Sequence, residues 1–127
     1  MPSVIIKEST KTTPHLHLNA ELGLIEIKGK FIHENSYEVF EPIIRWVNEY
    51  IQKPLDNTTV NVYLEYLNTS SSVLLLDMFR KFEANLYKKG YAVLVNWYCD
   101  GDDLDMIEVG EDYQSIVDLP IRIIEVA

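Results

Sequence analysis

The sequence has one cysteine, Cys99, among its 127 residues. A single thiol cannot form a disulfide within the chain, and proteins without disulfides are typical of a reducing compartment. The sequence also has no run of about 18 apolar residues, the length that spans a bilayer. Its first residues, Met1 to Ser9, lack the apolar stretch of a secretory signal. We therefore expect a cytoplasmic protein.

Basic residues are scarce. The chain has 11 Lys and Arg against 20 Asp and Glu, which gives a formal net charge of −9. Surfaces that bind nucleic acid or anionic lipid need clustered Lys and Arg, so neither class of partner is expected. Hydrophobic residues make up 47% of the chain, enough for the core of one domain over residues 1–127. Within it, residues 1–13 are expected to form a loosely attached lead or an edge strand.

Several catalytic motifs are missing as well. No Gly-rich phosphate loop occurs, and no Ser stands between glycines as in a nucleophile elbow. The acidic turn Asp100–Asp105 does not fit a calcium loop, because Asp105 stands where the sharp bend needs Gly. The residues leave one catalytic alternative open, a small hydrolase or metal-binding enzyme that uses His33 with the acidic turn. No cofactor is expected.

The first half of the chain has the pattern of a hairpin followed by a helix. Apolar residues alternate from Pro14 to Gly29, which predicts two antiparallel strands. Asn35 has Glu38 three residues later, the spacing of a capping box at a helix start. Pro42 removes a helical hydrogen bond, so either the helix is kinked or a new helix begins there. Helical spacing predicts that Tyr37 faces the core.

In the second half, strands alternate with helices. The patterns predict strands over Val60–Leu67, Tyr91–Cys99 and Ile121–Val126. They predict one helix over Val73–Leu86 and a second helix that is capped by Asp102 or Asp103, has Ile116 facing inward and ends before Pro120. Gly110 weakens the last helix by about 1 kcal/mol relative to Ala. This order predicts an α/β fold: a mixed, mostly parallel sheet with an N-terminal hairpin and helices packed on it.

Three loops follow the carboxyl ends of the predicted parallel strands: Phe31–Asn35, Asn68–Ser72 and Asp100–Asp105. Such loops gather at one edge of the sheet, where open α/β sheets usually bind their ligands. We therefore expect His33 and Glu34 to lie near the acidic turn and near the loop that contains Thr69.

The most unusual stretch is the strand-to-helix junction Tyr66–Ser72. It has four consecutive hydroxyl residues, Thr69–Ser72, after Asn68, although a helix needs one capping side chain. The unpaired N–H groups of a helix start attract anions, so a phosphate attached to one of these hydroxyls would be stabilised there. Local capping by Ser and Thr explains the same composition without any modification.

The junction resembles a known family. Tyr66–Ser71, together with Glu34–Tyr37, Trp97–Tyr98 and Glu111–Tyr113, is similar to the SiaC family of bacterial regulatory phosphoproteins. The similarity runs from about Thr13 to the last strand. It implies a fold like that of anti-sigma-factor antagonists, the STAS-type α/β domain.

The resemblance also implies a function, that of a non-enzymatic switch. It implies that a Ser/Thr kinase of the histidine-kinase-like ATPase class phosphorylates the acceptor, Thr69, and that a metal-dependent protein phosphatase removes the phosphate. The unmodified form binds and activates a partner such as a diguanylate cyclase. Asn68, Ser70 and Ser71 match the residues that flank the acceptor.

The expected partner surface lies around this junction. It comprises residues of the two neighbouring loops, namely His33, Glu34, Asn35, Asp100, Asp102 and Asp103. A phosphate beside the acidic turn would add a charge of about −2, and repulsion could then release a bound partner.

Overall fold

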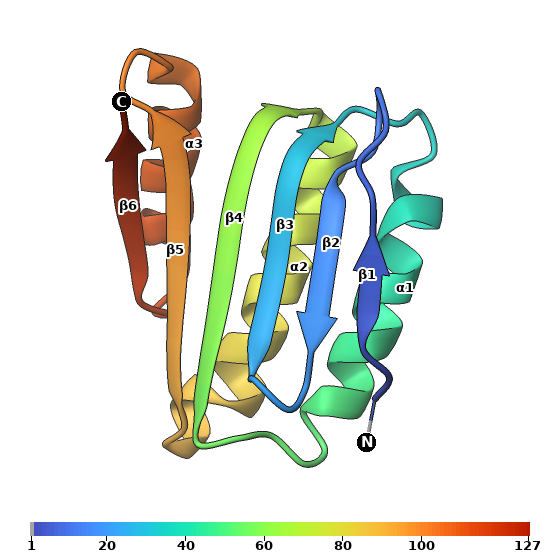
Figure 1. Ribbon diagram of the computed structural model, residues 1–127. Coiled ribbons are helices and arrows are strands. Elements are labelled where there is room, and N and C mark those ends of the chain that lie inside the picture. Colours follow the sequence, from blue (N-terminus) through green and yellow to red (C-terminus); the bar gives the residue numbers. More distant parts are fainter. Residues whose placement is uncertain (1) are drawn as a thin grey trace.

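The computed structural model describes residues 2–127, so Met1, the first residue of the expected lead, lies outside it. Figure 1 shows the order of the elements along the chain. They are β1 (Ile5–Lys7), β2 (His15–Asn19), β3 (Leu24–Phe31), α1 (Ser36–Tyr50), β4 (Asn57–Leu67), α2 (Thr69–Asn85), a short 3₁₀ turn η1 (Tyr87–Lys89), β5 (Ala92–Asp100), α3 (Leu104–Ile116) and β6 (Ile121–Val126).

The sheet has six strands in the order β1-β2-β3-β4-β5-β6. Strands β1, β2 and β3 pair antiparallel, whereas β3 to β6 pair parallel. The mixed, mostly parallel sheet with an N-terminal hairpin is therefore confirmed. The lead contributes the edge strand β1, and the Ile32 amide donates to the Thr12 carbonyl at 3.0 Å, which joins the end of the lead to the β3–α1 loop.

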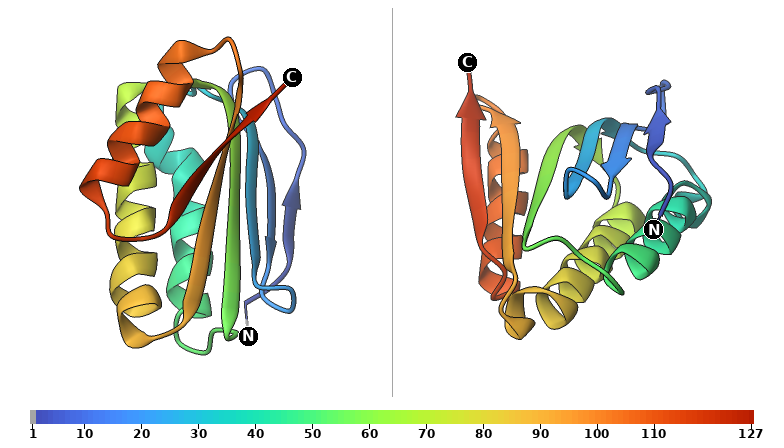
Figure 2. Two further views of the ribbon diagram at one scale, coloured as in Figure 1. Left: turned by 90° about the vertical axis from the view of Figure 1, so that its left-hand side faces the viewer. Right: turned by 60° about the horizontal axis from the view of Figure 1, so that its bottom comes forward.

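All three helices lie on one face of the sheet, as both views in Figure 2 show. The strand order explains this arrangement. Each parallel strand is followed by its immediate neighbour in the same direction, and right-handed crossovers then place every helix on the same side. The β3–α1, β4–α2 and β5–α3 loops consequently lie along one edge of the sheet, the upper edge in Figure 1.

The core lies between the sheet and the helices. Alternate strand residues face the helices and are buried, for example Val60, Val62 and Leu64 of β4. Leu75, Phe79, Phe82 and Leu86 face them from α2 and its C-cap, as predicted, with no exposed surface.

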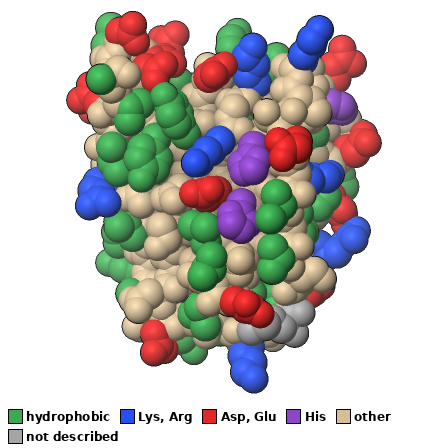
Figure 3. All heavy atoms as spheres, in the orientation of Figure 1, with side chains coloured by type: hydrophobic (Ala, Val, Ile, Leu, Met, Phe, Trp, Pro, Cys, Tyr) green, Lys and Arg blue, Asp and Glu red, His purple; other side chains and the backbone are tan. Residues whose placement is uncertain are grey.

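The opposite face of the sheet is not covered by a helix, and Figure 3 shows histidine side chains among charged and hydrophobic ones on it. A polar row crosses four strands here. Asn61 donates to the Glu26 carboxylate at 3.2 Å, Asn96 donates to the Asn61 amide oxygen at 2.9 Å, and Arg122 Nε donates to Asn96 at 3.2 Å. These side chains satisfy one another, which suits a face in contact with water.

Three sequence predictions about the helices need correction. Helix α1 begins at Ser36 and continues through Pro42, so the prediction that a helix begins at Pro42 is wrong. The buried residues on both sides of Pro42, Phe40 and Ile43, outweigh the missing hydrogen bond. Tyr37 is 68% exposed and Ile116 is 48% exposed, because each lies one position away from the buried side of its helix, next to the buried residues Ser36 and Val117.

Gly110 of α3 lies directly against the Trp97 ring of β5. A Cβ atom at Gly110 would come within 2.6 Å of Trp97 Cδ1, closer than such contacts allow. The indole is 1% exposed, and its Nε1 donates to the Met106 carbonyl at 2.9 Å, so the ring cannot easily move away. The glycine that weakens α3 as a helix is therefore required by its packing.

We predict that Gly110→Ala destabilises the protein, although Ala is the better helix former. The new methyl group must displace Trp97 or α3, and overpacking of this kind typically costs about 1–3 kcal/mol. Urea unfolding followed by circular dichroism measures the change in the free energy of unfolding. Gly101→Ala is the matched control, because the nearest atom to its added Cβ is 3.7 Å away. Stabilisation by Gly110→Ala would contradict the packing argument.

Candidate functional site

The candidate site is the β4–α2 junction at the carboxyl edge of the sheet. Asn68 leaves β4 in an extended conformation, and its side-chain oxygen accepts from the Ser71 amide at 2.9 Å. That bond makes Asn68 the N-cap of α2. Thr69 is thus the first residue of α2, which begins before the predicted start at Val73.

Asn68 also connects the junction to the neighbouring β3–α1 loop. Its side-chain NH₂ group donates to the His33 carbonyl at 3.3 Å, and its backbone amide donates to the Phe31 carbonyl at 3.1 Å. One side chain therefore caps α2 and holds in place the loop that precedes α1.

Three of the four consecutive hydroxyls have hydrogen-bond partners within the fold. The Ser70 and Ser36 hydroxyls are 2.7 Å apart, and the Ser71 hydroxyl donates to that of Ser36 at 2.9 Å. The Ser72 hydroxyl donates to the Thr69 carbonyl at 2.7 Å. Local capping and helix packing thus account for these three hydroxyls.

The fourth hydroxyl, that of Thr69, differs from its neighbours. Thr69 is exposed, and its hydroxyl has no hydrogen-bond partner among residues 2–127. The backbone amides of Thr69 and Ser70 likewise have none within that range, as expected for the first turn of a helix. Thr69 thus presents a free hydroxyl beside two free N–H groups.

Two residues of the site were not among those selected from the sequence. Ser36, which is 3% exposed, joins the starts of α1 and α2 through Ser70 and Ser71. Its position four residues before the buried Phe40 could have shown that it faces inward. Tyr113 of α3 donates its hydroxyl to the Ser72 carbonyl at 2.7 Å, and burial raises the pKa of this phenol, which keeps it protonated.

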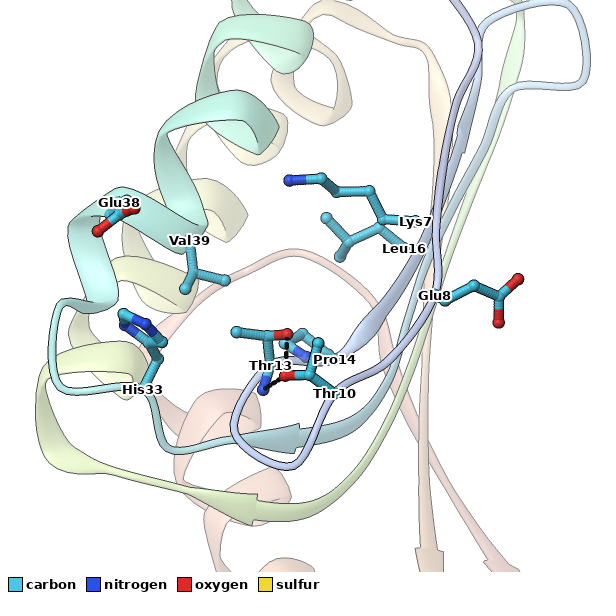
Figure 4. A pocket seen from close by; sticks show the side chains of 9 residues that line it. All are labelled: Lys7, Glu8, Thr10, Thr13, Pro14, Leu16, His33, Glu38 and Val39. Carbon is cyan, nitrogen blue, oxygen red and sulfur yellow. Dashed lines mark hydrogen bonds between the residues drawn. The ribbon is translucent and has the colours of Figure 1, made fainter.

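His33 lies next to the junction, but its ring has a local role. Its Nδ1 accepts from the Asn35 amide at 3.1 Å. Figure 4 shows the ring at the wall of a cavity of about 350 Å³ between the lead and α1, together with Lys7, Thr13 and Glu38. Asn35 caps α1 by accepting from the Glu38 amide at 3.1 Å, as predicted. Glu34, between His33 and Asn35, is exposed.

The acidic turn lies on the other side of the junction. Asp103 caps α3 by accepting from the Met106 amide at 3.2 Å, Asp100 accepts a hydrogen bond from the Tyr63 hydroxyl, and Asp102 is exposed. The hydrogen bond to Asp100 raises the pKa of Tyr63.

The structure does not bring His33 and the acidic turn into one site. Asp103 borders a cavity formed with the end of β4, whereas His33 borders the cavity beside the lead. The hydrolase alternative, which needs both in one place, is therefore not supported. Among residues 2–127, no three His, Cys, Asp or Glu side chains are placed to hold a metal ion, and no helix is long and apolar enough to cross a membrane.

Residues 7–126 match the model of the SiaC family regulatory phosphoproteins. The chain belongs to the SiaC family. This confirms the resemblance carried by the junction and its neighbouring motifs.

Proteins of Pseudomonas aeruginosa are similar to this chain. An uncharacterized protein of strain UCBPP-PA14 is 29% identical over 117 residues, which cover 90% of each chain. The crystal structure of apo-SiaC has a TM-score of 0.87 at 26% identity and covers 98% of this chain and 99% of that one. A chain in the structure of the diguanylate cyclase SiaD with its activator SiaC has the same TM-score and identity, over 94% of this chain and 97% of that one.

The geometry of this SiaC-family junction predicts unequal effects for its two asparagine caps. Asn35→Ala removes one capping bond and should cost about 1 kcal/mol of unfolding free energy. Asn68→Ala also removes the bond to the His33 carbonyl and the bonds that Asn68 accepts from the Ser36 and Ser70 hydroxyls, and it should cost about 2 kcal/mol. Chemical denaturation of both variants measures the difference, with Asn35→Ala as the matched control. Equal losses would show that the bond between the two loops contributes nothing.

Proposed function

We propose that this protein is a non-enzymatic, cytoplasmic partner-switching phosphoprotein whose switch is reversible phosphorylation of Thr69. A Ser/Thr kinase of the histidine-kinase-like ATPase class adds the phosphate, and a metal-dependent protein phosphatase removes it. The unmodified form binds and activates a diguanylate cyclase. In Pseudomonas aeruginosa, SiaC is the activator of the diguanylate cyclase SiaD and forms a complex with it.

The observation that carries this proposal is the contrast among the four hydroxyls. A kinase needs an accessible hydroxyl, and Thr69 alone in the run is both exposed and unbonded within the described residues. Modification of Ser71 would require the opening of a buried contact with Ser36, because Ser71 has no exposed surface.

The position of Thr69 suits a modification that leaves the fold intact. The free amides of Thr69 and Ser70 lie at the positive end of α2, where a phosphate is stabilised rather than repelled. The helix therefore does not have to unfold to accommodate the group. What changes is the surface, which gains a dianion beside exposed apolar side chains.

Those apolar side chains lie on both sides of Thr69 in the sequence. Tyr66 is 61% exposed, and Val73, one helical turn after Thr69, is 54% exposed. A partner that covers them would have to remove water from the phosphate, which is costly for a charged group without a buried counter-charge. Phosphorylation should therefore release such a partner.

We predict that the cognate kinase adds one phosphate, at Thr69. Thr69→Ala should abolish labelling, whereas Ser70→Ala should retain it, because the Ser70 hydroxyl is bonded to Ser36. Intact-mass analysis with peptide mapping distinguishes these outcomes. Undiminished labelling of Thr69→Ala would place the acceptor elsewhere.

We also predict that a negative group at Thr69 weakens binding of the cyclase without changing the fold. Thr69→Glu should lower affinity more than tenfold, about 1.4 kcal/mol, while Thr69→Ala should keep it. Isothermal titration calorimetry measures affinity, and circular dichroism with a melting curve checks the fold. Asn57→Glu, at the exposed start of β4 on the opposite edge, is the charge-matched control.

The same titration with enzymatically phosphorylated protein tests the switch directly, since Glu imitates a phosphate incompletely. Undiminished binding by the phosphorylated protein would exclude Thr69 as the switch for that cyclase.

A further inference from the structure

A groove lies between the end of β4 and the first turns of α3, and one of its lining residues, Leu67, is two residues before Thr69 in the sequence. Its volume is about 360 Å³. The lining residues come from both elements and are Glu65, Tyr66, Leu67, Asp103, Asp105, Met106 and Val109. Apolar and acidic side chains thus share one depression at the edge where the predicted switch lies.

Exposed apolar residues occur in the lining of the groove and next to it in the sequence. Tyr66 is 61% exposed, and Leu104, the first residue of α3, is 74% exposed. Val73 of α2 is also exposed, although it does not line the groove. Single exposed apolar residues are common, but several beside one groove indicate a contact surface.

The acidic part has no cation to balance it. None of the described residues that line the groove is Lys or Arg, and neither Glu65 nor Asp105 is in an ion pair among residues 2–127. Lys30, opposite Tyr66 on the neighbouring strand β3, does not line it. A partner with complementary charge would therefore bring Lys or Arg to these carboxylates.

We propose that this groove binds an amphipathic segment of a partner protein in which apolar side chains alternate with Lys or Arg at helical spacing. An apolar side chain of the segment packs on Leu67, Met106 and Val109, while flanking basic groups contact Glu65 and Asp105. This is the helix-in-groove mode of recognition. The assignment of this segment to the partner that Thr69 controls rests on the proposed function.

The chemistry of the groove can be tested without that partner. The probe is a helical peptide of Leu and Lys at amphipathic spacing, and the matched peptide has Glu in place of every Lys. Amide chemical shifts of the isotope-labelled protein report where each peptide binds. The Lys peptide should perturb the end of β4 and the start of α3, whereas the Glu peptide should bind at least about tenfold more weakly.

Two pairs of variants separate this groove from the general negative charge of the protein. The double variant Glu65→Gln with Asp105→Asn should weaken the Lys peptide at least about fivefold. The double variant Glu21→Gln with Glu49→Gln removes the same charge from exposed positions elsewhere and should bind like the parent. Leu104→Ser should weaken binding, whereas Leu22→Ser, which is 63% exposed at the opposite edge, should not.

The proposal is wrong if the Lys peptide binds the Glu65 and Asp105 variant as well as the parent, or if its shifts are spread over all acidic surfaces. It is also wrong if the Glu peptide binds as tightly. These results do not involve a kinase or a cyclase. Loss of the switch with normal peptide binding would overturn the proposed function alone, and the reverse result would overturn the groove alone.

Discussion

The arrangement of the candidate site depends on the side chain of Asn68. Its oxygen caps α2 and its NH₂ group holds the His33 carbonyl, so one amide determines where two helices begin relative to each other. The Ser36, Ser70 and Ser71 hydroxyls then fill the space between the two helix starts. Because these groups are occupied with one another, the only hydroxyl of the run left for another molecule among the described residues is that of Thr69.

The sheet topology determines what surrounds this site. A sequential strand order puts all three helices on one face and all three βα loops along one edge. The β4–α2 junction, in the middle of that edge, is flanked by the His33 loop and by the acidic turn. A phosphate on Thr69 would therefore lie between the His33 loop and the acidic turn. His33 and Asp103 themselves border separate cavities.

Features that depend on residues close together in the sequence could be predicted, and contacts between residues far apart in the sequence could not. The cap Asn35, a cap at Asp102 or Asp103, and the strand-to-helix junction around Thr69 follow from side chains within a few residues, so they could be identified. The Tyr113 bond to Ser72 joins residues far apart in the chain and has no local signal. The errors at Tyr37 and Ile116 have one cause: each is an apolar residue next to the buried position of its helix, and the apolar pattern selected it in place of Ser36 and Val117.

The charge of the groove bears on how phosphorylation could release a partner. A partner with Lys or Arg would be attracted to an added phosphate, so repulsion cannot be the reason for its release. The attraction is small, however, because exposed ion pairs contribute about 0–1 kcal/mol. An apolar side chain the size of Val loses about 1.5–3 kcal/mol when its burial is prevented, and desolvation of the phosphate adds to that loss. If the partner covers Tyr66 and Val73, the loss of apolar contact exceeds the gain from charge, and the dianion favours release.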